Sequence, residues 1–233
     1  SARIADSIVP VIRNAGGECF TNAEIEQIVI EGGKATGVRM ADGEVLRAPM
    51  IISTAGAHNT YQRLLAPEQS QKLGFASELQ GISASAAHVS LYIGLEGTPE
   101  ELKLPKANYW IYPHYDHDKA VADFQADPNA ELPVCYVSFP AAKDPAFQER
   151  FPGKSTIEII TLAPYERFAK WEETRWKKRG EDYEAMKAAI SERLLEQLYR
   201  FEPQVKDAIV HHELSTPLST QHFVNYAKGE IYG

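Results

Sequence analysis

Hydrophobic and polar residues alternate with a period of two in the middle of the chain. From Ala87 to Leu95 every second residue is aliphatic, and a histidine, a serine, a tyrosine and a glycine lie between them. Because successive strand residues point to opposite faces of a sheet, this pattern predicts a strand with two distinct faces. Shorter apolar and aromatic runs predict four further strands, at residues 108–112, 134–139, 156–162 and 208–214.

Other segments space their apolar residues as a helix does. The clearest is 181–201, where large apolar residues fall on one face and charged residues lie off it. The segment 2–15 has the same periodicity and is followed by Gly16-Gly17, where a left-handed C-terminal cap is expected. Further helices are predicted at 59–65, 117–126 and 164–177.

The chain between the first two helices has the pattern of short strands and turns. Segments 18–21, 25–31, 36–40 and 44–47 are separated by turn signals such as Gly32-Gly33 and Asp42-Gly43, which predicts an antiparallel β-meander. The apolar run from Met50 to Gly56 predicts a buried strand that ends in small residues.

The layout predicts an α+β fold with two parts. The first part covers residues 1–65 and contains the helix, the meander and the buried strand. The second covers 66–233 and is expected to hold a mixed or antiparallel β-sheet with helices on one face.

Composition limits the classes of partner. The 233 residues include 24 Lys and Arg against 32 Asp and Glu, a net charge of -8. No long stretch is basic enough to neutralise a row of phosphates, so nucleic acid is not an expected partner. Cys19 and Cys135 lie far apart and indicate neither a disulfide framework nor a thiolate zinc cluster. No apolar run is long enough to span a membrane, and a cytoplasmic location is expected.

Sequence motifs typical of phosphate binding and of metal binding are incomplete or weak in this chain. The run from Pro152 to Thr156 has some likeness to a phosphate-binding loop, but it lacks the first glycine and precedes a strand. The clusters 114–118 and 211–213 contain the only His and carboxylate groupings that could ligate a metal. Capping by Asp116 and opposite strand faces for His211 and His212 are the simpler interpretations, so no metal is expected.

Aromatic residues are concentrated on the strands of the second part. They could form a wall for an elongated apolar ligand, because ligand cavities are lined mainly by apolar and aromatic groups. Ordinary packing in a sheet and core is the alternative interpretation. The candidate cavity residues are Tyr92, Tyr109, Trp110, Tyr112 and Tyr136.

The order of the segments resembles the central part of FAD-dependent oxidoreductases of the phytoene desaturase, carotenoid isomerase and retinol saturase family. The resemblance covers essentially the whole chain and rests on an ordered series of motifs. These are Gly16-Gly17-Glu18, Asn22–Ile28, Gly33–Val38, Asp42-Gly43-Glu44, Ile51–Gly56, Ser90–Leu95, Phe139-Pro140, Pro152–Thr156, Thr216–Thr220 and Gly229–Gly233.

The resemblance implies an enzyme acting on a polyene or isoprenoid lipid, such as a carotenoid or retinoid, by desaturation, saturation or isomerisation. It also implies that residues 1–65 are part of a FAD-binding domain and 66–233 a substrate-binding domain, as in the interior of FAD-dependent amine-oxidase-like enzymes. The family's cofactor contacts carry over to Glu24, Ile25, Thr54 and Ala55.

The chain also departs from the family's pattern. It lacks the G-x-G-x-x-G segment that holds the FAD pyrophosphate, so we interpret it as an interior fragment and expect no FAD bound to this chain. No catalytic residue is assigned. We expect an apolar small-molecule substrate, a homo-oligomer of the fragment, and a peripheral membrane contact of the full-length protein. The alternatives are a flavin amine oxidase with a small polar substrate and a non-catalytic binding or scaffolding domain.

Overall fold

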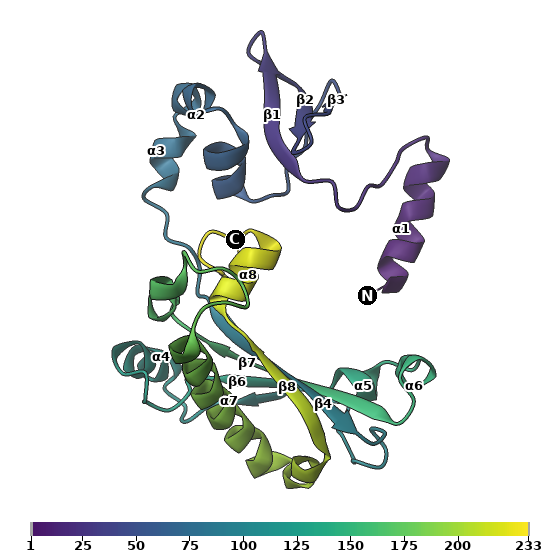
Figure 1. Ribbon diagram of the computed structural model, residues 1–233, viewed down its shortest axis with the longest axis vertical. Coiled ribbons are helices and arrows are strands. Elements are labelled where there is room, and N and C mark those ends of the chain that lie inside the picture. Colours follow the sequence, from purple (N-terminus) through teal and green to yellow (C-terminus); the bar gives the residue numbers. More distant parts are fainter. Residues whose placement is uncertain (1, 233) are drawn as a thin grey trace. The chain divides into compact units, whose positions relative to one another are not determined.

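The computed structural model describes residues 2–232 and divides into two compact units, 1–83 and 84–233. In the first unit the elements are α1 (Ala2–Asn14), β1 (Ile25–Glu31), β2 (Lys34–Met40), β3 (Val45–Arg47), the π-helix η1 (Asn59–Leu64), α2 (Pro67–Leu73) and α3 (Phe75–Leu79). Figure 1 labels the α-helices and strands of this unit. The sequence pattern placed a division near residue 65, whereas the compact unit also includes α2 and α3, where the ring of Phe75 lies 5.0 Å from that of Tyr61 in η1.

The predicted β-meander is present in the first unit. Strands β1, β2 and β3 form an antiparallel sheet in that order. Gly32 and Gly33 join β1 to β2 with φ values of 56° and 78°, which only glycine adopts readily and which suit a two-residue hairpin turn.

Two predicted strands of the first unit are absent. Residues 18–21 and 50–56 have no strand partner among the described residues, and apart from the half-buried Ile51 their apolar side chains are exposed, including Met50 at 73% and Ile52 at 80%. A strand needs a neighbour to take its backbone hydrogen bonds, and a buried strand also needs a cover for its side chains. The described part of this unit supplies neither, so the prediction of a buried strand at Met50–Gly56 was wrong for this chain.

The second unit is built on a five-stranded sheet with the order β5-β6-β7-β4-β8. All of its described pairs are antiparallel, which settles the choice between mixed and antiparallel left open by the sequence. Its elements are β4 (His88–Glu96), β5 (Tyr109–Ile111), α4 (His117–Ala126), β6 (Cys135–Ser138), α5 (Pro140–Lys143), α6 (Phe147–Arg150), β7 (Lys154–Leu162), η2 (Tyr165–Arg167), η3 (Ala169–Trp171), α7 (Glu181–Phe201), η4 (Pro203–Ala208), β8 (Ile209–Ser215) and α8 (Pro217–Val224).

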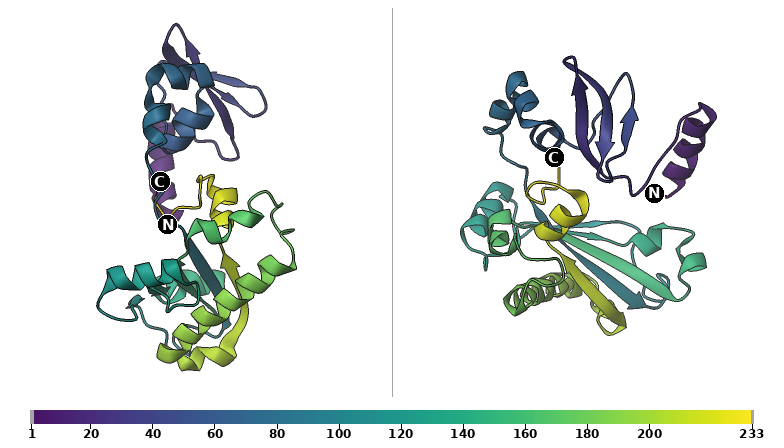
Figure 2. Two further views of the ribbon diagram at one scale, coloured as in Figure 1. Left: turned by 90° about the vertical axis from the view of Figure 1, so that its left-hand side faces the viewer. Right: turned by 45° about the horizontal axis from the view of Figure 1, so that its top comes forward.

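Helix α7 packs against one face of this sheet, as Figures 1 and 2 show. The apolar side chains of β4 and β7 on this face pack with Leu194 and Leu198 of α7, and all are almost completely buried. The predicted helix 181–201 is therefore confirmed, with its apolar stripe turned to the core. The α+β class with antiparallel sheets is confirmed as well.

The predicted helix at 164–177 is replaced by two short 3-10 turns and a loop. The buried Arg179 explains the interruption. Its Nη1 donates to the carbonyl oxygens of Trp171 at 2.7 Å and Thr174 at 2.8 Å. The Trp171 carbonyl also accepts the amide of Thr174 at 3.0 Å in a turn, so the guanidinium and this turn take the place of a continuing helix.

Helix α8 was not predicted, although its start carries a recognisable signal. Thr216 and Ser219 form a reciprocal capping box, and Pro217 occupies the first helical turn. Gly229 follows with a φ of 61°, and the chain then returns to the residue before β4, where Ala87 bridges to Glu230. Helix α8 and this C-terminal segment lie next to the start of β4, where the candidate site begins.

Candidate functional site

The face of the five-stranded sheet opposite α7 carries a row of polar side chains. Antiparallel pairing places Ser138 opposite Glu158, Glu158 opposite Tyr92, and Tyr92 opposite Glu213. Directly paired residues share a face, so these four side chains lie on one line across β6, β7, β4 and β8. The two ends of the row meet cations: Lys143 donates to Ser138 at 2.9 Å, and Lys187 pairs with Glu213 at 2.5 Å.

The middle of this row is electrostatically perturbed. Burial raises the pKa of Glu158, an effect that the nearby Lys143 partly offsets. Burial also raises the pKa of Tyr92, and the negative charge of Glu158 adds to that rise. Within residues 2–232 the Glu158 carboxylate makes no hydrogen bond or ion pair, while the Tyr92 ring is 48% exposed. A carboxyl group of raised pKa beside a protonated phenol is suited to hydrogen-bonding a ligand's polar group.

The neighbouring row on the same face is more apolar. Register pairs Trp110 with Tyr136, Tyr136 with Ile160, and Ile160 with Ser90. The rings of Trp110 and Tyr136 are 4.8 Å apart, and the Trp110 side chain is 63% exposed. The face opposite α7 thus combines a polar row with an aromatic and aliphatic one.

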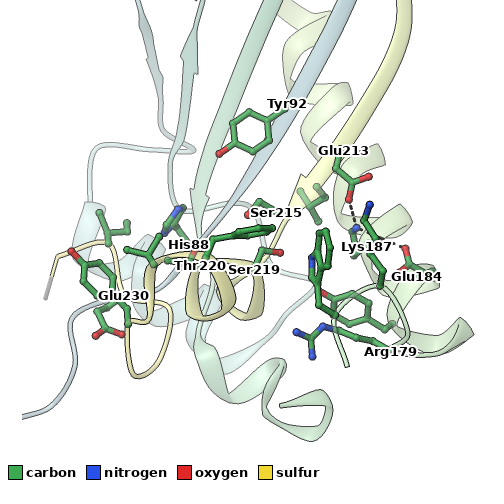
Figure 3. A pocket seen from close by; sticks show the side chains of 18 residues that line it. His88, Tyr92, Arg179, Glu184, Lys187, Glu213, Ser215, Ser219, Thr220 and Glu230 are labelled. Carbon is green, nitrogen blue, oxygen red and sulfur yellow. Dashed lines mark hydrogen bonds and ion pairs between the residues drawn. The ribbon is translucent and has the colours of Figure 1, made fainter. Parts of the chain in front are cut away.

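A cavity of about 810 Å³ adjoins this face. Figure 3 shows that its walls come from β4, β8, the loop before α7, α7 itself, α8 and the C-terminal segment. All of these elements belong to the second unit. The volume falls within the range of about 300–1,000 Å³ typical of small-molecule sites. Its lining includes the aromatic residues Tyr92, Trp176, Tyr183, Phe223 and Tyr226.

The carboxylates in the cavity already have partners. Glu213 and Glu184 both face Lys187, at 2.5 Å and 3.8 Å. Glu230 accepts hydrogen bonds from the backbone amides of Ala227 at 3.3 Å and Lys228 at 2.7 Å. The cavity is therefore polar in part, but its negative charges are compensated within the chain.

His88 is a lining residue with a shielded nitrogen whose hydrogen-bonding capacity is unused within residues 2–232. Its Nδ1 is shielded and has no partner among the described residues, and burial lowers the pKa of the imidazole. Since the shielded nitrogen cannot reach a ligand, Nε2 is the atom available to one. His88 was not predicted as a site residue, although it lies in the period-two segment on the same face as Tyr92.

The structure separates the five predicted aromatic cavity residues. Tyr92 lines the cavity, and Trp110 and Tyr136 lie together on the same sheet face. Tyr109 belongs instead to the core: its hydroxyl donates to Glu202, its ring packs edge-on against Phe139 at 5.2 Å, and burial raises its pKa to about 12.

Tyr112 also lies away from the cavity, because it stacks on His117 at 4.1 Å. Alternation along β5 accounts for Tyr109, because it sends Tyr109 to the α7 side and Trp110 to the other face, whereas Tyr112 follows the end of the strand at Ile111.

The predicted cofactor contacts lie in the first unit. Glu24 precedes β1, and its carbonyl accepts the amide of Ala41 at 2.9 Å, while Ile25 begins the strand. Thr54 and Ala55 lie in exposed coil before η1. Their amides donate to no group in the described part of the chain, so they are free for an external acceptor.

The two histidine clusters, at 114–118 and 211–213, have the arrangements expected of a helix cap and of a strand with two faces. Asp116 caps α4 by accepting the amide of Lys119 at 3.0 Å, as predicted. His211 and His212 pair with successive β4 residues, Gly94 and Ile93, and so occupy opposite faces of β8. Within residues 2–232, no group of three or more His, Cys, Asp or Glu side chains is arranged to hold a metal ion.

Comparison with known proteins gives two curated relatives of clear similarity. The all-trans-retinol 13,14-reductase of Danio rerio is 34% identical over 241 residues, which cover 100% of this chain and 40% of the relative. The neurosporene-forming phytoene desaturase of Rhodobacter capsulatus is 30% identical over 219 residues, covering 92% of this chain and 39% of the relative. The chain belongs to the phytoene desaturase/retinol saturase-like family. No protein-family model matches the sequence.

The fold of this family member is shared with a solved structure. An oxidoreductase from Methanosarcina mazei superposes with a TM-score of 0.55 over 91% of this chain and 41% of that chain, at 17% identity. The chain spans about 40% of the length of the retinol reductase it matches. None of the helices described for residues 2–232 has both the length and the apolar character needed to cross a membrane.

Proposed function

We propose that the chain forms the substrate-binding part of a flavin-dependent oxidoreductase that acts on a polyene or isoprenoid lipid. A carotenoid or a retinoid is the expected substrate, and the reaction is a desaturation, a saturation or an isomerisation. The observation that carries the proposal is the alignment of the whole chain with a retinol 13,14-reductase, joined by its alignment with a phytoene desaturase.

The second unit supplies a suitable binding surface. A polyene is flat and apolar, and it packs well against aromatic rings such as those of Tyr92, Trp110 and Tyr136. A retinoid also carries one polar end group. The Nε2 of His88 and the protonated hydroxyl of Tyr92 can exchange hydrogen bonds with such a group beside the aromatic surface.

The residues of this chain would supply only a minor part of the flavin's contacts. The free amides near Thr54 and Ala55 fit a contact with a nucleotide, and the backbone at Glu24 and Ile25 fits the adenine contact that the resemblance implies. The described residues contain no glycine-rich turn leading into a helix that would bind the pyrophosphate. When bound, FAD would supply the hydride or electron transfer.

In this arrangement the residues of the chain bind and orient the substrate. Tyr92 is protonated at neutral pH, as a phenol with the ordinary pKa of 10 already is, and burial and the charge of Glu158 raise that pKa further. Its hydroxyl therefore remains a hydrogen-bond donor toward the ligand. The aromatic row covers one side of the apolar part of the substrate and so keeps water from that side.

An amine oxidase with a small polar substrate is the second candidate, and the polar half of the cavity favours it. Recognition of an ammonium group requires a free carboxylate, however, and Glu184, Glu213 and Glu230 are already paired. A non-catalytic scaffold remains the third class. Ligand binding separates the three candidates.

The test is a fluorescence titration of the chain with all-trans-retinol, using Tyr92→Ala and a matched control. Tyr115 is fully exposed, so Tyr115→Ala removes the same side chain away from the cavity. We expect saturable binding with one site per chain, weakened about tenfold by Tyr92→Ala because an aromatic contact is lost, and unchanged by Tyr115→Ala. Equal affinities of the two variants, or binding of benzylamine in place of retinol, would contradict the proposal.

A further inference from the structure

A second, smaller pocket lies further along β4 from the cavity described above. Its volume is about 240 Å³, and its lining includes Gly94 of β4, Thr156 of β7, Val210 of β8, Phe147 of α6 and Phe151 directly after α6. Gly94 and Thr156 pair with each other, and Gly94 follows Tyr92 by two residues, so both belong to the sheet face opposite α7. The pocket and the cavity are therefore neighbours on one face of the sheet.

Gly94 leaves a gap in the row of side chains on this face of β4. The alternate positions of the strand carry a histidine, a serine, a tyrosine and a glutamate, and Gly94 lies between the last two. The backbone does not require a glycine, because its φ is not in the left-handed region and a Cβ there would meet only His211, at 3.9 Å. A glycine inside a strand often marks a place where a ligand approaches the backbone closely.

The walls around this gap are apolar and partly open. The rings of Phe147 and Phe151 lie 5.2 Å apart, and Phe151 is 52% exposed. Val210, on the edge strand β8, is 62% exposed. Two aromatic rings and an aliphatic side chain beside a bare backbone form a surface that an apolar group can cover.

Two polar residues of the pocket already have partners. Lys154 forms an ion pair with Glu96, and the hydroxyl of Ser155 donates to the carbonyl oxygen of Gly97 at 2.8 Å. A charged ligand group would have to break these contacts or stay unpaired, which is costly where water is excluded. The pocket therefore favours an uncharged, apolar group.

The spacing along β4 sets the length of a ligand that reaches both places. His88 in the cavity and Gly94 in the pocket are six residues apart, which corresponds to about 20 Å along a strand. An extended chain advances about 1.2 Å per bond, so about 16 bonds span this distance. An isoprenoid alcohol with four isoprene units has that length, whereas one with three units extends only about 14 Å and falls short of Gly94.

We propose that the pocket at Gly94 is a second subsite, which holds the apolar end of an isoprenoid whose polar end lies in the larger cavity beside His88. The half-exposed ring of Tyr92 lies between the two places and contacts the middle of the chain. This inference rests on the proposed function and adds to it a length requirement. A ligand too short to reach Gly94 loses the contacts with Phe147 and Phe151.

A series of isoprenols of increasing length tests the subsite in the full chain. Geraniol, farnesol and geranylgeraniol share the same hydroxyl end and have two, three and four isoprene units; calorimetric titration measures their affinities. The test variant Gly94→Leu fills the pocket with a side chain that the strand backbone accepts. The matched control Gly81→Leu adds the same side chain at an exposed glycine of the first unit, whose φ is not in the left-handed region either.

The expected result depends on ligand length. Geranylgeraniol should bind the unchanged chain about tenfold more tightly than farnesol does, because its last isoprene unit enters the pocket and leaves water. Gly94→Leu should abolish this gain while changing the affinities for geraniol and farnesol by less than about twofold. Gly81→Leu should keep the gain.

A second variant tests the wall of the pocket without altering the sheet. Phe151→Ser removes one of the two rings at a half-exposed position, and Phe20→Ser is its matched control, because Phe20 is 70% exposed in the first unit. Phe151→Ser should weaken the binding of geranylgeraniol alone, and Phe20→Ser should weaken none of the three ligands.

Two outcomes would overturn the subsite alone. If Gly94→Leu weakened all three isoprenols equally, the substitution would act through the sheet as a whole. If the gain for geranylgeraniol survived in both Gly94→Leu and Phe151→Ser, its last unit would bind elsewhere, and the pocket would be left to a side chain of a second copy or of another protein segment. Failure of all three isoprenols to bind the unchanged chain would overturn the proposed function and the subsite together.

Discussion

The two faces of the five-stranded sheet have different roles: one forms the core of the second unit and the other borders the cavity. On the α7 side, Val89, Leu91, Ile93 and Leu95 of β4 are at most 2% exposed and contact a closed core. On the other side the same strand presents His88, Tyr92 and Gly94 to a cavity and a partly exposed surface. Stability and recognition therefore depend on alternate residues of one strand, and substitutions at neighbouring positions should separate them.

Adjacent substitutions in β4 give the largest predicted effect. Leu91→Ala should lower the free energy of unfolding by about 2–5 kcal/mol, because it leaves a void in a fully buried core. Tyr92→Ala should cost less than about 1 kcal/mol, since half of that side chain is already exposed, while it weakens retinol binding. Urea unfolding of both variants, read by circular dichroism, measures the difference.

The converse result would break the comparison between the faces. If Tyr92→Ala destabilised the chain as strongly as Leu91→Ala, the face opposite α7 would be a second core. The retinol titration of Leu91→Ala in the absence of denaturant supplies the other control. Its affinity should be close to that of the unchanged chain as long as it is folded.

A substitution at Gly229 tests whether the C-terminal segment closes the cavity. Its φ is 61°, and a Cβ there would lie 2.2 Å from the carbonyl oxygen of Pro217. The segment that follows bridges to Ala87, just before β4, and contributes Glu230 and Ile231 to the cavity. Gly229→Ala should therefore cost about 2–3 kcal/mol and weaken retinol binding, because the backbone must move away from α8.

Gly153→Ala is the matched control for this substitution. Gly153 also has a positive φ, 69°, but a Cβ there meets nothing within 4 Å. Only the conformational cost of about 1–2 kcal/mol should remain, with retinol affinity unchanged. Equal losses in the two variants would show that the contact with Pro217 does not hold the C-terminal segment in place.

Local patterns in the sequence were enough to predict the frame of the second unit. The period-two segment at Ala87–Leu95 became β4, and the apolar stripe of 181–201 became α7 with the same bounds. The Asp116 cap was predicted from its place before a helical segment. Each of these features is decided by residues close together in the chain, which is why the sequence alone reveals it.

The site depends on contacts that the sequence does not display. Tyr109 and Trp110 are adjacent and both aromatic, yet the register of β5 sends one to the core and the other to the opposite face. The cavity joins His88 to Lys187 and Glu230, residues far apart in the chain. At Met50–Gly56 the apolar run indicated burial, but burial requires a partner element that the described residues lack. The expectation that such exposed surface drives self-association stays a prediction.

The smallest effect concerns Glu158, at the centre of the polar row. Burial raises the folded-state pKa of this carboxyl above its ordinary value of 4.5, so the folded chain binds its proton more tightly than the unfolded chain does. The stability contributed by Glu158 is thus fully present below pH 4.5 and declines as the pH rises through the raised folded-state pKa. Glu158→Gln should remove that decline and make the chain slightly more stable at neutral pH, by no more than about 0.5 kcal/mol.

Thermal unfolding from acid to neutral pH would measure this effect. Glu192→Gln is the control, because Glu192 is exposed on α7 and makes no hydrogen bond or ion pair in the described part of the chain. The difference between Glu158→Gln and the unchanged chain should grow with pH, and that for Glu192→Gln should stay flat. A loss of stability in Glu158→Gln at neutral pH would mean that Lys143 stabilises an ionised carboxylate more than burial penalises it, and the polar row would then be part of the structural frame.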